Sequence, residues 1–436
     1  MRFVSTRGGQ TASLDEALVQ GIAADGGLFL PQAMPQMSAD DFANNRSLQE
    51  TATQFLRPFF ADSSLAQDLE EIVAETFHFA VPVTSLQDEK FRLDLLQLYH
   101  GPTAAFKDIG AGFLAACLGR LQGDAGNPLT ILVATSGDTG GAVAAAFNNR
   151  VGMRVVVLYP DGKVSERQAH QLTCWGDNVL SLAVDGTFDD CQALVKGALA
   201  DEELSTRYRF SSANSINIGR LLPQSVYYAH ASTQHFQKTG RKPGFIIPTG
   251  NLGNGLACVI ARDIGLPVGP ILFATNENRV IAEFLDGGEW APRHSIATLA
   301  SAMDVGNPSN MERLRSLHGD AWDIAQQVSA IPVSDLEIQQ QIRLNKNEFN
   351  IVTCPHTATA THVWRTMSEE VRRATDWIAV ATAHPAKFEQ IVEPIIGEKV
   401  PLPADLERIL QQPRRFVRIK PEANALNDAL FEKFAA

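Results

Sequence analysis

The sequence predicts an α/β protein with two parallel-sheet α/β domains and a mostly helical N-terminal region. Three observations lead to this fold class. From about residue 91, short runs of Val, Ile, Leu and Ala alternate with longer stretches of helical periodicity. These runs are almost continuously apolar, as expected of strands that helices cover on both faces. With 436 residues, 45% of them hydrophobic, the chain is long enough for two or three domains.

Residues 1–85 are predicted to form the mostly helical N-terminal region. Ser13 and Glu16 have the spacing of a capping box, which places the start of a helix at this point. The glycines in Asp25-Gly26-Gly27 predict that this helix ends there.

The remainder is predicted to form two α/β parts, residues 86–240 and 241–436, which meet at the turn residues of 238–244. The smaller domain is expected to lie within the first part. Strands are predicted at 91–98, 129–135, 154–160, 178–184, 244–248, 270–276 and 377–383. Residues 402–410 and 421–434 are predicted to form capped surface helices.

The composition argues against several classes of partner. The formal charge is −12, because 49 acidic residues outnumber 37 basic ones, so nucleic acid and anionic membranes are not expected partners. No signal peptide and no apolar run of about 18 residues is visible, which predicts a cytoplasmic location. The five cysteines are scattered and lack metal-ligand spacing, so we expect reduced thiols and no metal site.

Lys107 is the candidate catalytic residue. It follows a Gly-Pro turn and opens a helix of small residues, YHGPTAAFKDIGAGF. The positive end of the helix dipole and partial burial would lower the pKa of this amine and favour the neutral form that makes Schiff bases. The alternative is a solvated lysine that pairs with Asp108 or Asp94.

Two glycine-rich turns each join a predicted strand to a helix and leave backbone N–H groups free to hold an anion. The first turn contains Ser136, Gly137, Asp138 and Thr139, and the second contains Gly250, Asn251, Leu252, Gly253 and Asn254. Because Asp138 brings a negative charge to the first turn, its side chain is expected to turn away from a bound carboxylate or to meet a cation. The alternative for the first turn is a tight turn whose glycines serve packing.

Thr382 follows the last predicted strand, in WIAVATAHPAKF. Its neutral hydroxyl is suited to a hydrogen bond with a ring nitrogen that carries no proton. The alternative is an ordinary residue at the end of a strand or at a helix cap.

The segments HGPTAAFKD, SGDTGGA, PTGNLGNG and ATAHPAKF resemble motifs of the threonine synthase family, whose members are fold type II enzymes that use pyridoxal phosphate (PLP). The opening VSTRGGQ and SLDEALVQGIAADGGLFLP is similar to the same family, so the likeness covers almost the whole chain. The resemblance implies that Lys107 holds PLP as a Schiff base. It also implies that residues 250–254 bind the cofactor phosphate, that Thr382 meets the ring nitrogen, and that residues 136–139 receive the substrate carboxylate. Asn254 stands where Asp is common, which leaves the role of its side chain open.

The resemblance implies the conversion of O-phospho-L-homoserine and water to L-threonine and phosphate. A doubly charged substrate phosphate requires local cations in this acidic chain, and the candidates for substrate binding are Lys163, Asn217 and Arg220. The alternative for each of the three is an ordinary surface residue. The segment 304–310 is explained equally well as a turn with a helix cap. His356 and His362 have no metal-like spacing and are interpreted as structural.

Two alternatives remain open from the sequence. One is a related PLP-dependent dehydratase or phospholyase, and the other is a non-catalytic relative that binds amino acids. Retention of Lys107, both glycine turns and Thr382 argues against the second alternative. A monomer or a homodimer is expected.

Overall fold

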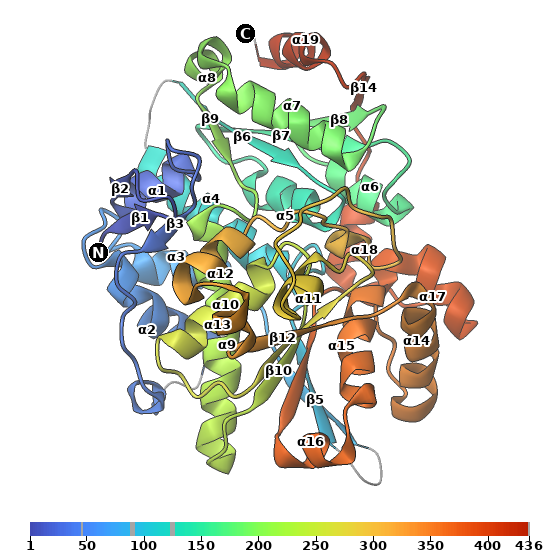
Figure 1. The fold of residues 1–436 in the computed structure, drawn as a ribbon. Coiled ribbons are helices and arrows are strands. Elements are labelled where there is room, and N and C mark those ends of the chain that lie inside the picture. Colours follow the sequence, from blue (N-terminus) through green and yellow to red (C-terminus); the bar gives the residue numbers. More distant parts are fainter. Residues whose placement is uncertain (45–46, 88–91, 123–126, 435–436) are drawn as a thin grey trace.

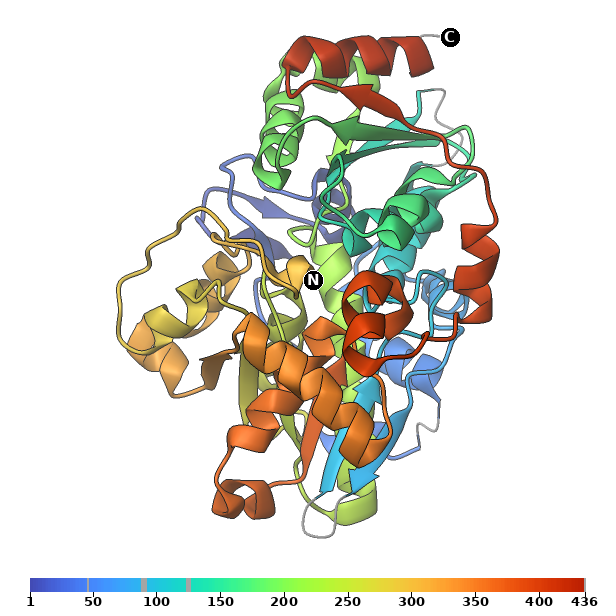
Figure 2. The same ribbon diagram turned by 90° about the vertical axis from the view of Figure 1, so that its right-hand side faces the viewer.

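The computed structural model describes residues 1–44, 47–87, 92–122 and 127–434. Two parallel-stranded sheets lie at opposite ends of the molecule, and the N-terminal region packs beside α9 and the start of α4 (Figure 1). Figure 2 shows the same separation of the two sheets from a second direction. The predicted α/β class is confirmed.

The larger sheet, as described, has the strand order β12-β11-β10-β13-β5-β4. All neighbouring pairs are parallel except β4 and β5, which are antiparallel. Its strands are β4 (Val83–Gln87), β5 (Arg92–Gln97), β10 (Gly244–Pro248), β11 (Ile271–Thr275), β12 (Val328–Pro332) and β13 (Trp377–Ala381).

The smaller sheet has the order β14-β8-β7-β6-β9 and is parallel throughout the described strands. Every residue of β6 and β8 is buried, which is why these strands are continuous apolar runs in the sequence. The strands are β6 (Leu129–Ala134), β7 (Met153–Pro160), β8 (Val179–Val184), β9 (Phe210–Ser212) and β14 (Val417–Ile419).

Each predicted strand is present, with ends that differ by at most two residues, and Phe91 of the first lies outside the described residues. In the two α/β sheets, the sequence analysis did not predict β4, β9, β12 and β14. All four are edge strands, and β14 is largely exposed, so none forms a long apolar run. The predicted division at residues 85 and 240 stays a prediction. The large sheet takes strands from both sides of residue 240, and β14 joins the small sheet from the C-terminal end.

The N-terminal region combines helices with a small antiparallel sheet of order β2-β1-β3. The capping box of Ser13 and Glu16 is confirmed, but the helix ends at Gln20, earlier than predicted, because Gly21 adopts a φ of 71° and caps it. The elements are β1 (Phe3–Ser5), β2 (Thr11–Ala12), α1 (Leu14–Gln20), β3 (Phe29–Pro31), η1 (Ala39–Phe42), α2 (Leu48–Phe60) and α3 (Leu69–Thr76).

Helices cover the sheets and join their strands. They are α4 (Lys107–Gln122), α5 (Asp138–Phe147), α6 (Glu166–Thr173), α7 (Phe188–Ala200), α8 (Glu202–Tyr208), α9 (Ile218–Thr239), α10 (Gly253–Asp263), α11 (Val280–Leu285), η2 (Ser301–Met303), α12 (Met311–His318), α13 (Ala321–Ala325), α14 (Asp335–Phe349), α15 (Pro355–Thr366), α16 (Glu369–Ala374), η3 (Pro385–Phe388), α17 (Glu389–Ile396), α18 (Ala404–Leu410) and α19 (Ala423–Phe434). The two predicted C-terminal helices are α18 and α19. Leu426 and Leu430 of α19 are buried in the hydrophobic core beside the small sheet, so this helix is part of that core as well as of the surface.

Candidate active site

A cavity of about 450 Å³ lies where loops from both sheets meet. The loops that follow β6, β10 and β13 all border it, and parallel sheets place their ligands at these carboxyl ends of strands. The sequence-predicted residues that line it are Lys107, Ser136, Asp138, Thr139, Arg220, Gly250, Asn251, Leu252, Gly253, Asn254 and Thr382. Gly137, Lys163 and Asn217 are not among the lining residues.

Lys107 is the first residue of α4, and its side chain faces the cavity. Burial lowers the pKa of its amine to about 8, and the cations Arg220 and Lys387 act in the same direction, while Asp138 opposes them. Within the part of the chain that the structure describes, the amine has no hydrogen-bond partner. It is therefore available for covalent chemistry.

The alternative pairing of Lys107 with Asp108 or Asp94 is wrong. The carboxylate of Asp108 accepts hydrogen bonds from the backbone N–H and the hydroxyl of Thr103. Asp94 pairs with Arg92, with 2.7 Å between the guanidinium and the carboxylate. Both acidic groups are thus occupied by other partners.

Backbone hydrogen bonds fix the position of Lys107 relative to Thr382. The N–H of Phe106 donates to the carbonyl of Thr382 at 2.8 Å, and the N–H of His384 donates to the carbonyl of Ala104 at 3.0 Å. The two segments are therefore joined as a short antiparallel bridge. Thr382 is 5% exposed and lines the same cavity as Lys107.

The loop at residues 250–254 presents backbone N–H groups to the cavity. Leu252 has a φ of 62° and precedes α10 without a side-chain cap, and the described structure gives the N–H groups of residues 250–252 no hydrogen-bond partner. A Cβ added to Gly250 would lie 2.6 Å from the Cα of Met303, so only glycine fits there. This arrangement is an anion nest at a helix start.

The asparagine side chains of this loop hold its shape. The amide of Asn251 donates to the hydroxyl of Ser215 at 2.6 Å. Asn254 accepts from the hydroxyl of Tyr228 at 2.6 Å and donates to the carbonyl of Pro248 at 3.3 Å. The side chain of Asn254 is thus engaged with the protein, and its backbone is the part left for a ligand.

The loop before α5 also depends on a glycine in a conformation and space that other residues do not fit. Gly137 adopts a φ of 134°, and a Cβ there would lie 2.6 Å from the side-chain nitrogen of Gln168. The hydroxyl of Thr135 accepts from the N–H groups of Gly137 and Gly140 and shapes the turn. Gly137 therefore serves the conformation of the loop, while Ser136 and Thr139 line the cavity.

Asp138 meets a cation, which is one of the two arrangements that the sequence left open for a carboxylate in this loop. Its carboxylate lies 2.8 Å from the ammonium of Lys387, and the two side chains are 4% and 0% exposed. Burial by itself raises the pKa of Asp138, but attraction to Lys387 and Lys107 outweighs it and holds the pKa well below its ordinary value. Sequence reasoning missed Lys387, although it lies in the ATAHPAKF segment.

The three predicted substrate-binding residues have different positions. Arg220 is 2% exposed, lines the cavity, and has an Nε without a partner, and burial lowers its pKa to about 10. Asn217 instead caps α9, and its side chain bonds to the carbonyls of Leu18 and Ser212. Lys163 is exposed in the turn between β7 and α6. Among the three, only Arg220 borders the cavity.

Several buried polar atoms in the cavity wall have no hydrogen-bond partner. They are Nε of Arg220, Oδ1 of Asn214, Oε1 of Gln224, Oγ1 of Thr249 and Nδ1 of His356. Such a concentration of unsatisfied groups is unusual in a folded core and fits a cavity built for a polar ligand.

His356 was interpreted as structural, and its Nε2 does accept from the N–H of Ala302 at 3.0 Å. His356 nevertheless lines the cavity. Asn307 and Ser309 line it as well, although their segment, residues 304–310, could equally have been a turn with a helix cap. Sequence patterns did not separate these residues from ordinary turns because their positions depend on distant segments.

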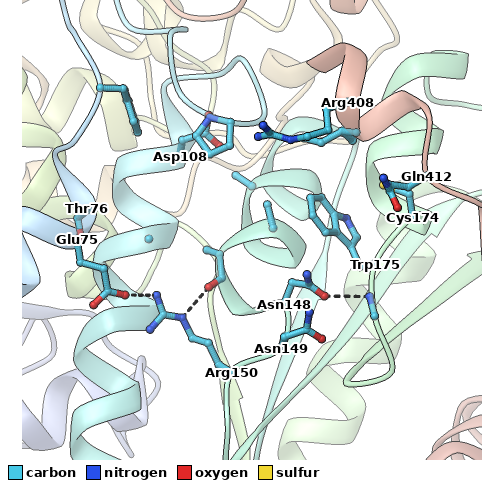
Figure 3. A pocket seen from close by; sticks show the side chains of 18 of the residues that line it. Glu75, Thr76, Asp108, Asn148, Asn149, Arg150, Cys174, Trp175, Arg408 and Gln412 are labelled. Carbon is cyan, nitrogen blue, oxygen red and sulfur yellow. Dashed lines mark hydrogen bonds and ion pairs between the residues drawn. The ribbon is translucent and has the colours of Figure 1, made fainter. Parts of the chain in front are cut away.

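A second cavity of about 590 Å³ lies among α3, α4, α5 and α18 (Figure 3). Its cations are already paired: Arg150 with Glu75, Arg408 with Asp405, and Arg415 with Asp177. The lysine and both glycine loops border the first cavity, which is therefore the candidate active site.

In the ranges that the structure describes, no group of three or more His, Cys, Asp or Glu side chains is arranged to hold a metal ion. Over the same ranges, no helix has the length and hydropathy required to cross a bilayer. All five cysteines are free and buried, as expected.

Comparison with known proteins identifies the family. Residues 90–383 match the model of pyridoxal-phosphate dependent enzymes, residues 2–77 match the threonine synthase N terminus, and residues 357–430 match the threonine synthase C-terminal model. The threonine synthase of Escherichia coli is 39% identical over 400 residues, which cover 91% of both chains. The chain belongs to the threonine synthase family.

Solved structures of the family share the fold. The crystal structure of the Escherichia coli enzyme has a TM-score of 0.90 at 37% identity and covers 99% of this chain and 100% of that one. PLP-bound threonine synthase from Brucella melitensis has a TM-score of 0.90 at 32% identity and covers 100% of both chains. This enzyme is accordingly a PLP-dependent lyase of fold type II.

The residues of the cavity fit this cofactor. Three groups around the cavity suit three parts of PLP. The free amine of Lys107 suits its aldehyde, the unpartnered N–H groups of residues 250–252 suit its phosphate, and the hydroxyl of buried Thr382 suits its ring nitrogen. Unsatisfied wall atoms remain beyond these three groups, which leaves polar contacts for a substrate.

Proposed function

We propose that this enzyme converts O-phospho-L-homoserine and water to L-threonine and inorganic phosphate. The family supports threonine formation, and the amine of Lys107 carries the proposal for the site. A pKa of about 8 and the lack of a hydrogen-bond partner make this amine a nucleophile and a base at neutral pH. PLP, when bound, supplies an aldehyde for amines and a conjugated ring that accepts negative charge from the α-carbon of the substrate.

Lys107 is proposed to attach the cofactor and then, once the substrate amine has displaced it, to take the α-proton. Removal of a β-proton allows the γ C–O bond to break, and phosphate leaves with the bonding electrons. A proton would then add at the γ-carbon, and water would deliver its hydroxyl group to the β-carbon while its other proton leaves as part of hydrogen phosphate. A proton would finally return to the α-carbon, and Lys107 would displace the amine of threonine from the cofactor. Of the two cavity-lining groups Lys107 and Asp138, Lys107 is the proposed base, because Asp138 is paired with Lys387.

The two loops are proposed to bind different anions. Residues 250–254 would hold the cofactor phosphate through backbone N–H groups, and Thr382 would donate to the ring nitrogen, which therefore stays unprotonated. The loop of Ser136, Gly137, Asp138 and Thr139 would receive the substrate carboxylate through its N–H and hydroxyl groups.

Arg220 is the proposed ligand of the substrate phosphate. Its Nε is unpartnered, and it is a buried cation in the cavity wall, where a doubly charged phosphate gains most from a charged hydrogen bond. Lys163 and Asn217 are not proposed as ligands, because Lys163 is exposed and outside the cavity lining and the side chain of Asn217 caps α9. The cytoplasm stays the proposed location, and five free thiols agree with a reducing compartment.

Incubation of the purified holoenzyme with O-phospho-L-homoserine tests the reaction. Equal amounts of threonine and phosphate are expected, with Lys107→Ala as an inactive control. A keto acid and ammonia as the main products would instead make the enzyme a dehydratase or phospholyase. Reduction of the holoenzyme with borohydride followed by peptide mass spectrometry should place the pyridoxyl group on Lys107, and an adduct elsewhere would overturn the site.

A further inference from the structure

The loop proposed to bind the substrate carboxylate contains a carboxylate of its own. Asp138 opens α5 between Gly137 and Thr139 and lines the cavity. Two like charges a few ångströms apart repel each other strongly in a site that excludes water. Binding an amino acid at this loop therefore requires that the charge of Asp138 be neutralised.

Lys387 is placed to do this. Its ammonium contacts the carboxylate of Asp138 at 2.8 Å and donates to the carbonyl of Thr103 at 2.7 Å. Lys387 is 0% exposed and does not line the cavity, so it approaches Asp138 from within the protein. Gln168 adds a hydrogen bond to the same carboxylate at 3.1 Å.

Other nearby cations are committed elsewhere. Lys107 attracts Asp138, but its amine is the group assigned to the cofactor. Arg167 lies on α6 next to Gln168 and is directed to Glu389 and Glu393. Lys387 is thus the cation in direct contact with Asp138 among the described residues.

The segment around Lys387 is also held against the small sheet's helices. The hydroxyl of Ser165 donates to the carbonyl of Lys387 at 2.9 Å, and the guanidinium of Arg167 donates to the carbonyl of Ala386. These two bonds hold the backbone of residues 386 and 387 against the start of α6, while the ammonium contacts Asp138 and the carbonyl of Thr103.

We propose that Lys387 is a positioning residue for substrate recognition: it neutralises and orients Asp138 so that the loop 136–139 can accept the carboxylate of an amino acid. This inference rests on the proposed function of that loop. Two unit charges about 6 Å apart at an effective dielectric constant of 20 change an equilibrium constant by roughly 100-fold. Loss of Lys387 is expected to weaken carboxylate binding by about this factor.

The test compares L-threonine with L-threoninamide, which lacks the carboxylate charge, as ligands of the PLP-loaded enzyme. Binding is followed by the change in cofactor absorbance. In Lys387→Met, the dissociation constant for threonine should rise by roughly 100-fold, while that for threoninamide changes by less than about threefold. If Lys387 has a purely structural role, its loss should weaken the binding of both ligands by the same factor. That result would overturn the proposal.

Two further variants complete the design. Lys387→Met combined with Asp138→Asn should return the threonine to threoninamide ratio to within about fivefold of the parent, because both charges are gone. Asp138→Asn alone should shift the ratio in favour of threonine, and it decides the question if Lys387→Met does not fold. An unchanged ratio in Asp138→Asn would overturn the inference.

Lys346→Met is the matched control, because this lysine pairs with Glu398 away from the cavity and should leave the ratio unchanged. The parent separates the two hypotheses. If the parent forms no threonine from O-phospho-L-homoserine, the proposed function fails. If the parent does form it and Lys387→Met keeps the parental ratio, the inference alone fails.

Discussion

The lowered pKa of Lys107 gives a direct test of the site in the cofactor-free protein. At pH 7.5, a pKa of about 8 leaves about a quarter of the amine neutral. An ordinary lysine with a pKa of 10.5 would be neutral in only about one molecule in a thousand. Burial at this position therefore raises the reactive fraction by about 200-fold.

Two substitutions should move this pKa in opposite directions. Asp138 stabilises the charged amine, so Asp138→Asn should lower the pKa of Lys107 below about 8. Arg220 disfavours the charged amine, so Arg220→Leu should raise the pKa above about 8. The sign follows from whether the removed neighbour attracts or repels an ammonium group.

The assay is reductive labelling of the cofactor-free enzyme with pyridoxal and cyanoborohydride over a range of pH. Peptide mass spectrometry measures the adduct on Lys107 at each pH. The labelling rate should rise with a midpoint near pH 8. A midpoint near 10.5, or the same midpoint in both variants, would refute the argument that burial and these two charges activate the amine.

Three other outcomes are expected. Gly250→Ala should weaken PLP binding at least tenfold, because its Cβ would lie 2.6 Å from Met303, whereas the Cβ of Gly253→Ala would meet nothing closer than 3.7 Å; equal PLP affinities of the two variants would contradict this. Ser13→Ala should lower the free energy of unfolding by about 1 kcal/mol in urea titrations, through loss of the capping box, and no change would show that the cap is dispensable. Arg313→Met should lower the free energy of unfolding by about 2–6 kcal/mol, because the buried guanidinium donates hydrogen bonds to the carbonyls of Phe29 and Ile216. A melting temperature within error of the parent would contradict this prediction.

The sequence by itself determined the parts of the site that follow from local order along the chain. Lys107, the two glycine turns and Thr382 each come directly after a turn or a buried strand, so one pattern predicts both the element and the chemistry at its end. Parallel sheets then bring these ends together. Fully buried strands were visible for the same reason, because their apolar runs are continuous.

Only the tertiary structure decided which polar residues reach the cavity. Lys163, Asn217 and Arg220 were equal candidates as residue types, but the cap of α9 uses Asn217, an exposed turn holds Lys163, and Arg220 alone faces inward. The edge strand β14 likewise joins the small sheet from the far end of the chain.

The pairing of Asp138 with Lys387 shows why the sequence alone could not decide which polar residues meet. The sequence indicated that this carboxylate needs a cation or must turn away, yet several lysines and arginines satisfied that condition equally. The contact joins a helix start beside the small sheet to a segment that follows β13 of the large sheet. Such a pair is set by how the two sheets pack against each other, and no local periodicity in the chain records that packing.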